Sequence, residues 1–372
     1  MATERDLLVV GGGPTGLATA IAAAQAGLET TVIEARDGVI DKACGEGLMP
    51  AAVDLLRGLG VQPAESHPFV GVRYVAGGHA VEGRFSGTPG LGVRRTVLHA
   101  ALRRRAEELG VTWHHARAGA VAVTPDHVTV AGLRGRHLVA ADGLRSPIRE
   151  QLGLSAPARR RPRLGVRRHF ARAPEDPFVQ VHWSPRAEAY VTPVGPDLVG
   201  VAFLFYRDRV GPTPAGTPRF DDLLADFPAL QRWLAGAEAA SPVAGAGPFE
   251  RRARRRVAGR VLLVGDAAGY LDPLTGEGLR LGFEAGQAAV QSILEGAPEA
   301  YERRWRRITR RYWWMTGGLL SVARSRLLRR ALVPTLRLCP PVMSATMRLL
   351  AEGDGQEGAP APEQLVARPD PS

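Results

Sequence analysis

Three glycines, Gly11, Gly13 and Gly16, constrain the fold of this chain more than any other feature of the sequence. They follow an apolar run at residues 6–10, which is typical of a buried parallel strand. The alanine-rich residues after them favour a helix that ends at a glycine. A second apolar run at residues 30–34 completes one strand–helix–strand unit, which predicts an α/β fold built on a parallel sheet.

The same glycines predict a turn that binds phosphate groups. Gly11 permits a tight turn, Gly13 lets backbone N–H groups approach a pyrophosphate, and Gly16 lets the helix pack on the strand. The helix N-terminus at Pro14 adds partial positive charge. Glu34, at the end of the second strand, is placed to accept hydrogen bonds from ribose hydroxyls and to repel a 2′-phosphate. The alternative is a glycine-rich turn without a ligand.

Two later strands also end in an aspartate beside a glycine. One apolar run leads into Asp142-Gly143, and another leads into Gly265-Asp266. A carboxylate at a strand end accepts hydrogen bonds from the hydroxyls of a ribityl chain, and the N–H groups of residues 276–278 would face an electron-rich ring edge. Ordinary structural turns are the alternative at both places.

In order and spacing, these three motifs (GxGxxG, ADGxxSxxR and GDAAGxxxPxxGEG) resemble the p-hydroxybenzoate hydroxylase superfamily of flavoproteins over residues 5–295. The resemblance implies an extended FAD, with its adenine end on the first strand–helix–strand unit and its isoalloxazine between two lobes. We therefore predict FAD contacts at Gly11, Gly13, Pro14, Thr15, Gly16, Glu34, Ala35, Arg36, Cys44, Gly45, Arg95, Asp142, Gly143, Gly265, Asp266, Pro273, Gly276, Glu277 and Gly278.

Two branches of this superfamily fit the sequence. The stretch Lys42-Ala-Cys44-Gly45 resembles the Lys-x-Cys-Gly segment that lies beside the flavin in geranylgeranyl reductases, so Lys42 and Cys44 are candidate catalytic residues. The aromatic signature of that branch, Tyr-x-Trp-x-Phe-Pro, is reduced here to Tyr190-Val-Thr-Pro193, and the halogenase signature Trp-x-Trp-x-Ile-Pro is absent. For Cys44 the alternative role is that of a small buried apolar residue.

We predict an FAD-dependent monooxygenase that hydroxylates a hydrophobic, electron-rich (phenolic or polyketide-like) small molecule in secondary metabolism. The alternative is a geranylgeranyl reductase-like enzyme that reduces prenyl or lipid double bonds, and a basic nucleic-acid-binding protein is the third hypothesis. Because only one dinucleotide unit is found, NAD(P)H is expected as a transient electron donor, with an electron-carrier protein as the alternative. The substrate is expected against an inserted sheet, near His182, Tyr190, Thr192 and Phe203. Alternation places His182 opposite Val181 and Trp183, so only one of these sets lines the cavity.

The order of the predicted elements divides the chain into lobes. We predict a Rossmann-like FAD-binding domain from residues 1–69, 94–160 and 251–300, and a mostly antiparallel substrate domain from residues 70–93 and 161–250. A helical C-terminal segment (residues 301–352) and a disordered tail (residues 353–372) follow. The basic, aromatic C-terminal segment either contacts an anionic membrane as a peripheral helix or caps the FAD lobe.

Charge and cysteine content limit the other classes of function. The net charge is +11, but Lys42 is the single lysine among 48 basic residues, which indicates base composition rather than nucleic-acid binding. The neighbouring His114 and His115 do not share a strand face, so we expect no metal site. Two cysteines and the absence of an export signal favour the cytoplasm, with peripheral membrane contact as the alternative.

Overall fold

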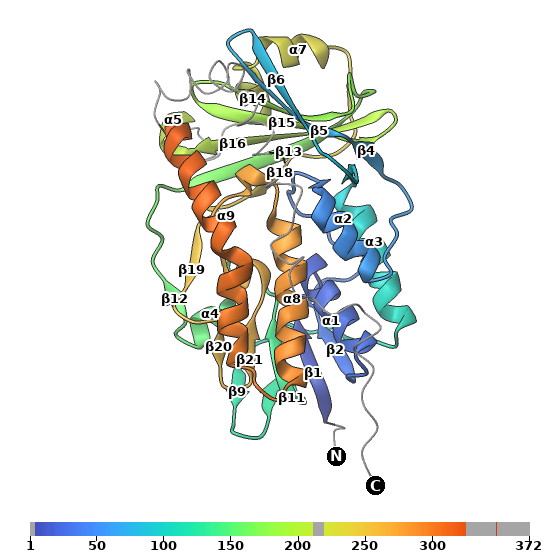
Figure 1. Cartoon of the computed structure of the whole chain (residues 1–372), viewed down its shortest axis with the longest axis vertical. Helices are drawn as coiled ribbons and strands as arrows, with labels where there is room; N and C mark the ends of the chain where they lie inside the picture. The colour runs from blue at the N-terminus through green and yellow to red at the C-terminus, as the bar shows by residue number, and fades with distance from the viewer. Residues whose placement is uncertain (1–3, 211–218, 325–346, 348–372) are drawn as a thin grey trace.

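We describe a computed structural model, in which residues 4–210, 219–324 and 347 are described. Figure 1 shows two lobes, with a parallel sheet and its helices below a second sheet. This is the α/β fold that the sequence predicts. The predicted tail at residues 353–372 and most of the predicted C-terminal segment after Arg324 lie outside the described residues.

The lower lobe is built on a parallel sheet with the strand order β20-β21-β11-β1-β2-β8. Its strands are β1 (Arg5–Val10), β2 (Thr30–Ile33), β8 (Thr112–His114), β11 (Leu133–Ala140) and β21 (Val261–Leu263), with β20 (Val257–Ala258) antiparallel at one edge and β9 (Val121–Val123) and β10 (Val128–Val130) extending from β11. Its helices are α1 (Pro14–Gln25), α2 (Pro50–Gly58), α3 (Arg95–Glu108), α4 (Pro147–Gln151), α8 (Gly278–Leu294) and α9 (Ala300–Arg324). Because β1 lies at the centre of the sheet, its last four residues, Leu7 to Val10, are apolar and at most 5% exposed.

Helices α1 and α8 approach each other closely through small residues. A Cβ at Gly282 would lie 2.3 Å from the Thr15 hydroxyl, and one at Gly286 would lie 2.3 Å from the Thr19 hydroxyl. Both distances are far below van der Waals contact, so only glycine fits at these positions of α8. The start of α8 is thereby fixed against the start of α1.

The upper lobe contains a sheet with the strand order β17-β13-β16-β15-β14-β5-β6, with β18 beside β13. Its strands are β5 (Gly71–Ala76), β6 (His79–Arg84), β13 (Arg163–Ala171), β14 (Phe178–Trp183), β15 (Ala187–Gly195), β16 (Leu198–Tyr206), β17 (Glu238–Ala239) and β18 (Ala244–Ala246). All neighbours are antiparallel except β14 and β5, which run parallel. Helices α6 (Phe220–Leu224) and α7 (Pro228–Trp233) cover the outer face, the face away from the lower lobe, while α5 (Arg207–Val210) follows β16.

Two small sheets connect the lobes. The first contains β3 (Gly47–Leu48), β7 (Gly90–Gly92) and β4 (His67–Phe69), and the second contains β12 (Ser155–Ala156), β19 (Arg251–Ala253) and β22 (Gly269–Tyr270). The predicted substrate-domain stretch 70–93 is therefore divided, since β5 and β6 join the large sheet and β7 joins the small one. A Cβ at Gly92 would lie 1.7 Å from the Pro193 carbonyl oxygen, so β7 lies directly against β15.

Helix α9 begins the predicted C-terminal segment and runs beside α8 toward the upper lobe (Figure 1). Its inner face is apolar and buried, with Tyr301, Trp305 and Tyr312 each at most 5% exposed. Within the described residues, no helix combines the length and the apolar character that a membrane span requires.

Candidate flavin site

The turn after β1 has the geometry that the glycine spacing predicts. Gly11 has a φ of +106°, and a Cβ there would lie 2.5 Å from the Ala141 carbonyl oxygen. A Cβ at Gly16 would lie 1.8 Å from the Gly11 carbonyl oxygen. The space at Gly13 is different, because the nearest atom to a Cβ there is Arg95 Nη2 at 3.8 Å. Gly11 and Gly16 are thus required by the protein's own packing, while Gly13 faces open space beside a cation.

Glu34 lies at the end of β2, directly beside this turn. Its Oε2 accepts a hydrogen bond from the Gly12 N–H at 2.9 Å, and its Oε1 accepts from Arg36 Nε at 3.0 Å. Burial raises the pKa of Glu34, but the hydrogen bonds from Arg36 and from Gly12 outweigh burial and hold the pKa below its ordinary value. Glu34 is therefore an ionised acceptor at neutral pH, as ribose recognition requires.

The three predicted motifs converge on one edge of the sheet. Val10 of β1 pairs with Ala140 of β11, and Ala140 pairs with Leu263 of β21. Because these strands are parallel, the residues that follow them share the carboxyl edge, where α/β sheets bind their ligands. Asp142 and Asp266 lie at this edge, and burial raises the pKa of each carboxyl.

One oxygen at this edge lacks a partner. Asp142 Oδ2 accepts from the Ile148 N–H at 3.1 Å, but Asp142 Oδ1 is buried and has no hydrogen-bond partner within residues 4–210 and 219–324. A buried unpaired carboxylate oxygen is costly, by about 1–3 kcal/mol. A ligand hydroxyl at this position would satisfy it.

A group of cations surrounds the same edge. A Cβ at Gly143 would lie 3.6 Å from Lys42 Nζ, which places Lys42 beside the Asp142 turn. Burial lowers the pKa of Lys42, and repulsion from Arg36 and Arg95 lowers it further. Arg36 pairs with Glu34, but among the described residues Lys42 and Arg95 form no ion pair with a carboxylate, so an anion such as a diphosphate would stabilise these two cations.

These observations fit FAD, whose diphosphate would lie beside Gly13, Arg95 and Lys42. The predicted residues Pro14, Thr15, Ala35, Gly45, Gly265, Pro273 and Gly276 all belong to the segments that border this edge. The side chain of Thr15 packs against Gly265 and Gly282, and the Glu277 carboxylate bonds Arg280 Nη2 at 2.7 Å. The backbone of Thr15 is therefore left to contact a cofactor, and Glu277 Oε2 is buried without a hydrogen-bond partner among the described residues.

The segment 41–47, which carries Cys44, is fixed between the lobes. Asp41 pairs with Arg167 of β13 at 2.6 Å, and the Gly45 carbonyl oxygen accepts from the Thr192 hydroxyl of β15 at 2.8 Å. Cys44 Sγ accepts from the Glu46 N–H at 3.4 Å. These contacts hold Cys44 against the inner face of the upper sheet, the face toward the lower lobe.

Glu46 is a site residue that the sequence analysis did not identify. It is 3% exposed and has a φ of +60°, which is unusual for a residue with a side chain. Its Oε1 accepts from the Arg95 N–H at the start of α3 at 2.8 Å, and its Oε2 lies 2.5 Å from His169 Nε2 of β13. One carboxylate thus links the cofactor lobe to the substrate sheet.

Of the four substrate residues predicted on the upper sheet, two lie on its inner face and two do not. Tyr190 and Thr192 face the lower lobe, and the Tyr190 hydroxyl donates to the Leu274 carbonyl oxygen at 3.3 Å. His182 and Phe203 were predicted wrongly, because they lie on the outer face. Phe203 is 0% exposed and packs beneath α6 and α7, and His182 bonds Gln180 Oε1 at 2.9 Å on that same face.

Three tyrosines lie deep in the protein yet keep part of their surface accessible: Tyr74, Tyr190 and Tyr270. Burial raises the pKa of Tyr74 to about 12 and raises the pKa of Tyr190 and Tyr270 well above its usual range, so all three hydroxyls stay neutral hydrogen-bond donors. Tyr270, beside Gly278, was missed, although it directly follows the Gly265–Gly269 turn.

A glycine turn on a Rossmann-like sheet, with a cationic edge and an inserted, mostly antiparallel sheet, defines an FAD-dependent oxidoreductase. Residues 4–295 match the FAD binding domain family, and the chain belongs to that family.

Relatives with assigned activities include reductases. The chain is 30% identical to a menaquinone reductase of Mycolicibacterium smegmatis, over 94% of this chain and 91% of the relative. It is 25% identical to a digeranylgeranylglycerophospholipid reductase of Methanosarcina acetivorans, over 82% of this chain and 81% of the relative. The flavin-dependent brominase Bmp2 shares the fold, with a TM-score of 0.80 and 20% identity over 98% of this chain and 97% of the brominase.

Proposed function

We propose that this flavoprotein reduces a carbon–carbon double bond in the prenyl or lipid chain of a hydrophobic substrate, with NAD(P)H as the transient electron donor. The observation that carries the proposal is the position of Cys44 on a segment held against the inner face of the upper sheet. The names of the two reductases that resemble the chain support the same class of substrate. This choice favours the alternative reading of the sequence over hydroxylation.

The inner face offers apolar contacts to such a substrate. Phe69, Val72, Val179 and Val181 form one buried cluster that also includes Met315 of α9. Burial of apolar surface contributes roughly 25 cal/mol per Å², so an isoprenoid chain gains affinity from each unit that it places on this face. The neutral hydroxyls of Tyr74 and Tyr190 are polar groups beside these contacts.

When bound and reduced by NAD(P)H, FAD would supply a hydride, which carries the two electrons of the reduction and forms the first C–H bond. The substrate π bond breaks and two C–H bonds form, so the protein must deliver a proton to the second carbon. An ordinary thiol is a stronger acid than a phenol, and burial raises the pKa of Tyr270 further. We therefore assign the proton to the thiol of Cys44 and assign Tyr270 to binding. Solvent protons then restore the thiol.

An anaerobic turnover assay tests this proposal. The chemically reduced holoenzyme is mixed with a prenylated lipid, and the product is analysed by mass spectrometry. We expect product that has gained two hydrogens without oxygen, and we expect Cys44→Ser to slow its formation by about 10²-fold or more, the usual contribution of a general acid. Product that forms only in air and contains one added oxygen atom contradicts the proposal.

Hydroxylation of a phenolic or polyketide-like compound in secondary metabolism is the second candidate. It is favoured by Tyr74 and Tyr190, whose neutral hydroxyls can donate hydrogen bonds to the oxygens of an aromatic substrate. The same assay in air, with phenolic substrates, tests it. Oxygen incorporation that survives in Cys44→Ser would favour this second candidate.

A further inference from the structure

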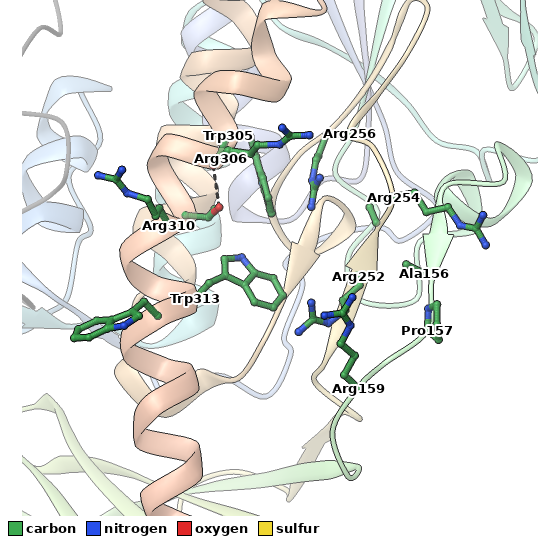
Figure 2. A pocket seen from close by; sticks show the side chains of 13 residues that line it. Ala156, Pro157, Arg159, Arg252, Arg254, Arg256, Trp305, Arg306, Arg310 and Trp313 are labelled. Carbon is green, nitrogen blue, oxygen red and sulfur yellow. Dashed lines mark hydrogen bonds between the residues drawn. The ribbon is translucent and has the colours of Figure 1, made fainter.

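A groove of about 740 Å³ lies on the side of the lower lobe, away from the flavin edge. Figure 2 shows it between α9 on one side and the residues around β19 and β12 on the other. We call it the basic groove, because six arginines and three tryptophans line it: Arg159, Arg252, Arg254, Arg256, Arg306, Arg310, Trp305, Trp313 and Trp314.

Two of these arginines are held in place by aromatic rings. The guanidinium of Arg256 lies 3.7 Å from the ring centroid of Trp305, and that of Arg252 lies 4.7 Å from the centroid of Trp313. Cation–π contacts of this kind fix the guanidinium plane and leave its outer N–H groups for other acceptors. The groove therefore presents ordered donors.

The positive charge of the basic groove exceeds the acids that pair with it. Glu302 pairs with Arg256 and Arg306, and Glu250 pairs with Arg252. In the described part of the chain, no carboxylate pairs with the guanidinium of Arg159, Arg254 or Arg310, although the Arg159 N–H donates to Glu250. The groove thus has an excess of donors that suits phosphate oxygens.

The exposed face of α9 continues this charge and adds an aromatic residue. Arg303, Arg307, Arg310 and Trp314 are exposed and are spaced three or four positions apart, so they share one helix face. Trp314 is 78% exposed, more than any other large apolar residue among those described. Arginines beside an exposed tryptophan are the composition of helices that lie in a membrane interface.

The arginine-rich surface extends along the helix. A second groove of about 500 Å³ follows beside the end of α9 and contains Arg160, Arg161, Arg209 and Arg324, with Asp208 as its acid. The two grooves together follow the flank of α9 from Trp305 to Arg324. An extended array of phosphates matches such a surface better than a single small anion does.

We propose that the basic groove and the exposed face of α9 dock on an anionic phospholipid bilayer, with the arginines on headgroup phosphates and Trp314 at the headgroup level. Trp314 favours a bilayer over a nucleic acid, because a fully projecting indole gains most from the apolar boundary below the headgroups. Docking is a binding property and does not depend on the reaction proposed above. It would place the cluster that contains Met315 about one helix diameter, roughly 10 Å, from the lipid.

Vesicle sedimentation of the holoenzyme, followed by its flavin absorbance, tests the proposal. We expect binding to vesicles that contain phosphatidylglycerol, little binding to pure phosphatidylcholine, and weakening as salt is raised. Each arginine near an anionic surface contributes about fivefold to affinity, so Arg307→Gln/Arg310→Gln should weaken binding about thirtyfold. Trp314→Gln should also weaken vesicle binding, and it should do so at all salt concentrations.

The matched control is Arg117→Gln/Arg232→Gln, which removes the same charge from exposed positions outside both grooves. This control variant should bind like the unaltered protein. Equal binding by the two double variants, no preference for phosphatidylglycerol, or tighter salt-dependent binding to duplex DNA would each overturn the proposal. Unchanged flavin absorbance and unfolding temperature in the variants show that the fold is retained.

Discussion

Replacing Glu46 tests whether one carboxylate holds the two lobes together. Glu46→Ala leaves the Arg95 N–H and His169 Nε2 without their acceptor in a site where Glu46 is 3% exposed. Removing one partner of a buried charged pair costs about 3–5 kcal/mol. Glu46→Gln keeps the shape and one acceptor oxygen, so it loses only the added strength of a charged hydrogen bond, about 1–2 kcal/mol.

The assay is urea unfolding of the holoenzyme and of the protein stripped of flavin, followed by tryptophan fluorescence. Glu107→Ala is the control, because Glu107 forms an exposed pair with Arg103 on α3, and its loss should change the unfolding free energy by less than about 0.5 kcal/mol. We expect the free energy of unfolding of Glu46→Ala to lie far below that of Glu46→Gln, and that of the control to be unchanged. If Glu46→Ala and Glu46→Gln destabilise equally, or if neither exceeds the control, the carboxylate does not link the lobes.

Three further predictions follow from the site. Gly16→Ala should yield misfolded protein, because a Cβ at Gly16 would collide with the backbone. A Cβ at Gly13 meets no backbone atom, so Gly13→Ala should keep a native circular dichroism spectrum and lose FAD. Equal behaviour of the two variants would contradict this reasoning. Lys42→Met should raise the Kd for FAD by about 10–100-fold in a fluorescence titration, and an unchanged Kd would remove Lys42 from the diphosphate site. Burial lowers the pKa of His182 to about 4. The neutral imidazole therefore contributes up to about 3 kcal/mol to the free energy of unfolding, and this contribution is complete above pH 6.5 and is lost as pH falls toward 4. His182→Gln should flatten the dependence of the unfolding free energy on pH between 6.5 and 4. If the variant shows the same pH dependence as the unaltered protein, His182 is not its cause.

The sequence predicts those parts of the fold that local pattern determines. The glycine turn, the acid at Glu34 and the convergence of Asp142 and Asp266 each follow from a strand that ends at a defined residue. Parallel strands then bring their carboxyl ends to one edge without further information.

What the sequence leaves open depends on contacts between distant segments. Alternation separates His182 from Val181, but which face meets the lower lobe is decided by α6 and α7, which cover the other face. Glu46 has no sequence signature, because its partners at Arg95 and His169 meet it only after the lobes pack. Docking of the lobes, rather than local propensity, creates that part of the site.

The hydroxyl oxygen of Tyr312 links α9 to the loop at residues 269–278. It accepts hydrogen bonds from the Leu271 and Asp272 N–H groups at 3.1 and 2.9 Å and donates to the Asp272 carbonyl oxygen at 2.8 Å. A phenol has one proton and two lone pairs, so this oxygen has no bonding capacity left. Three of the hydrogen bonds between the loop and the helix thus meet at one atom, beside the bond between the Thr275 and Thr316 hydroxyls at 3.2 Å. Phenylalanine at position 312, one atom smaller, would remove all three at once.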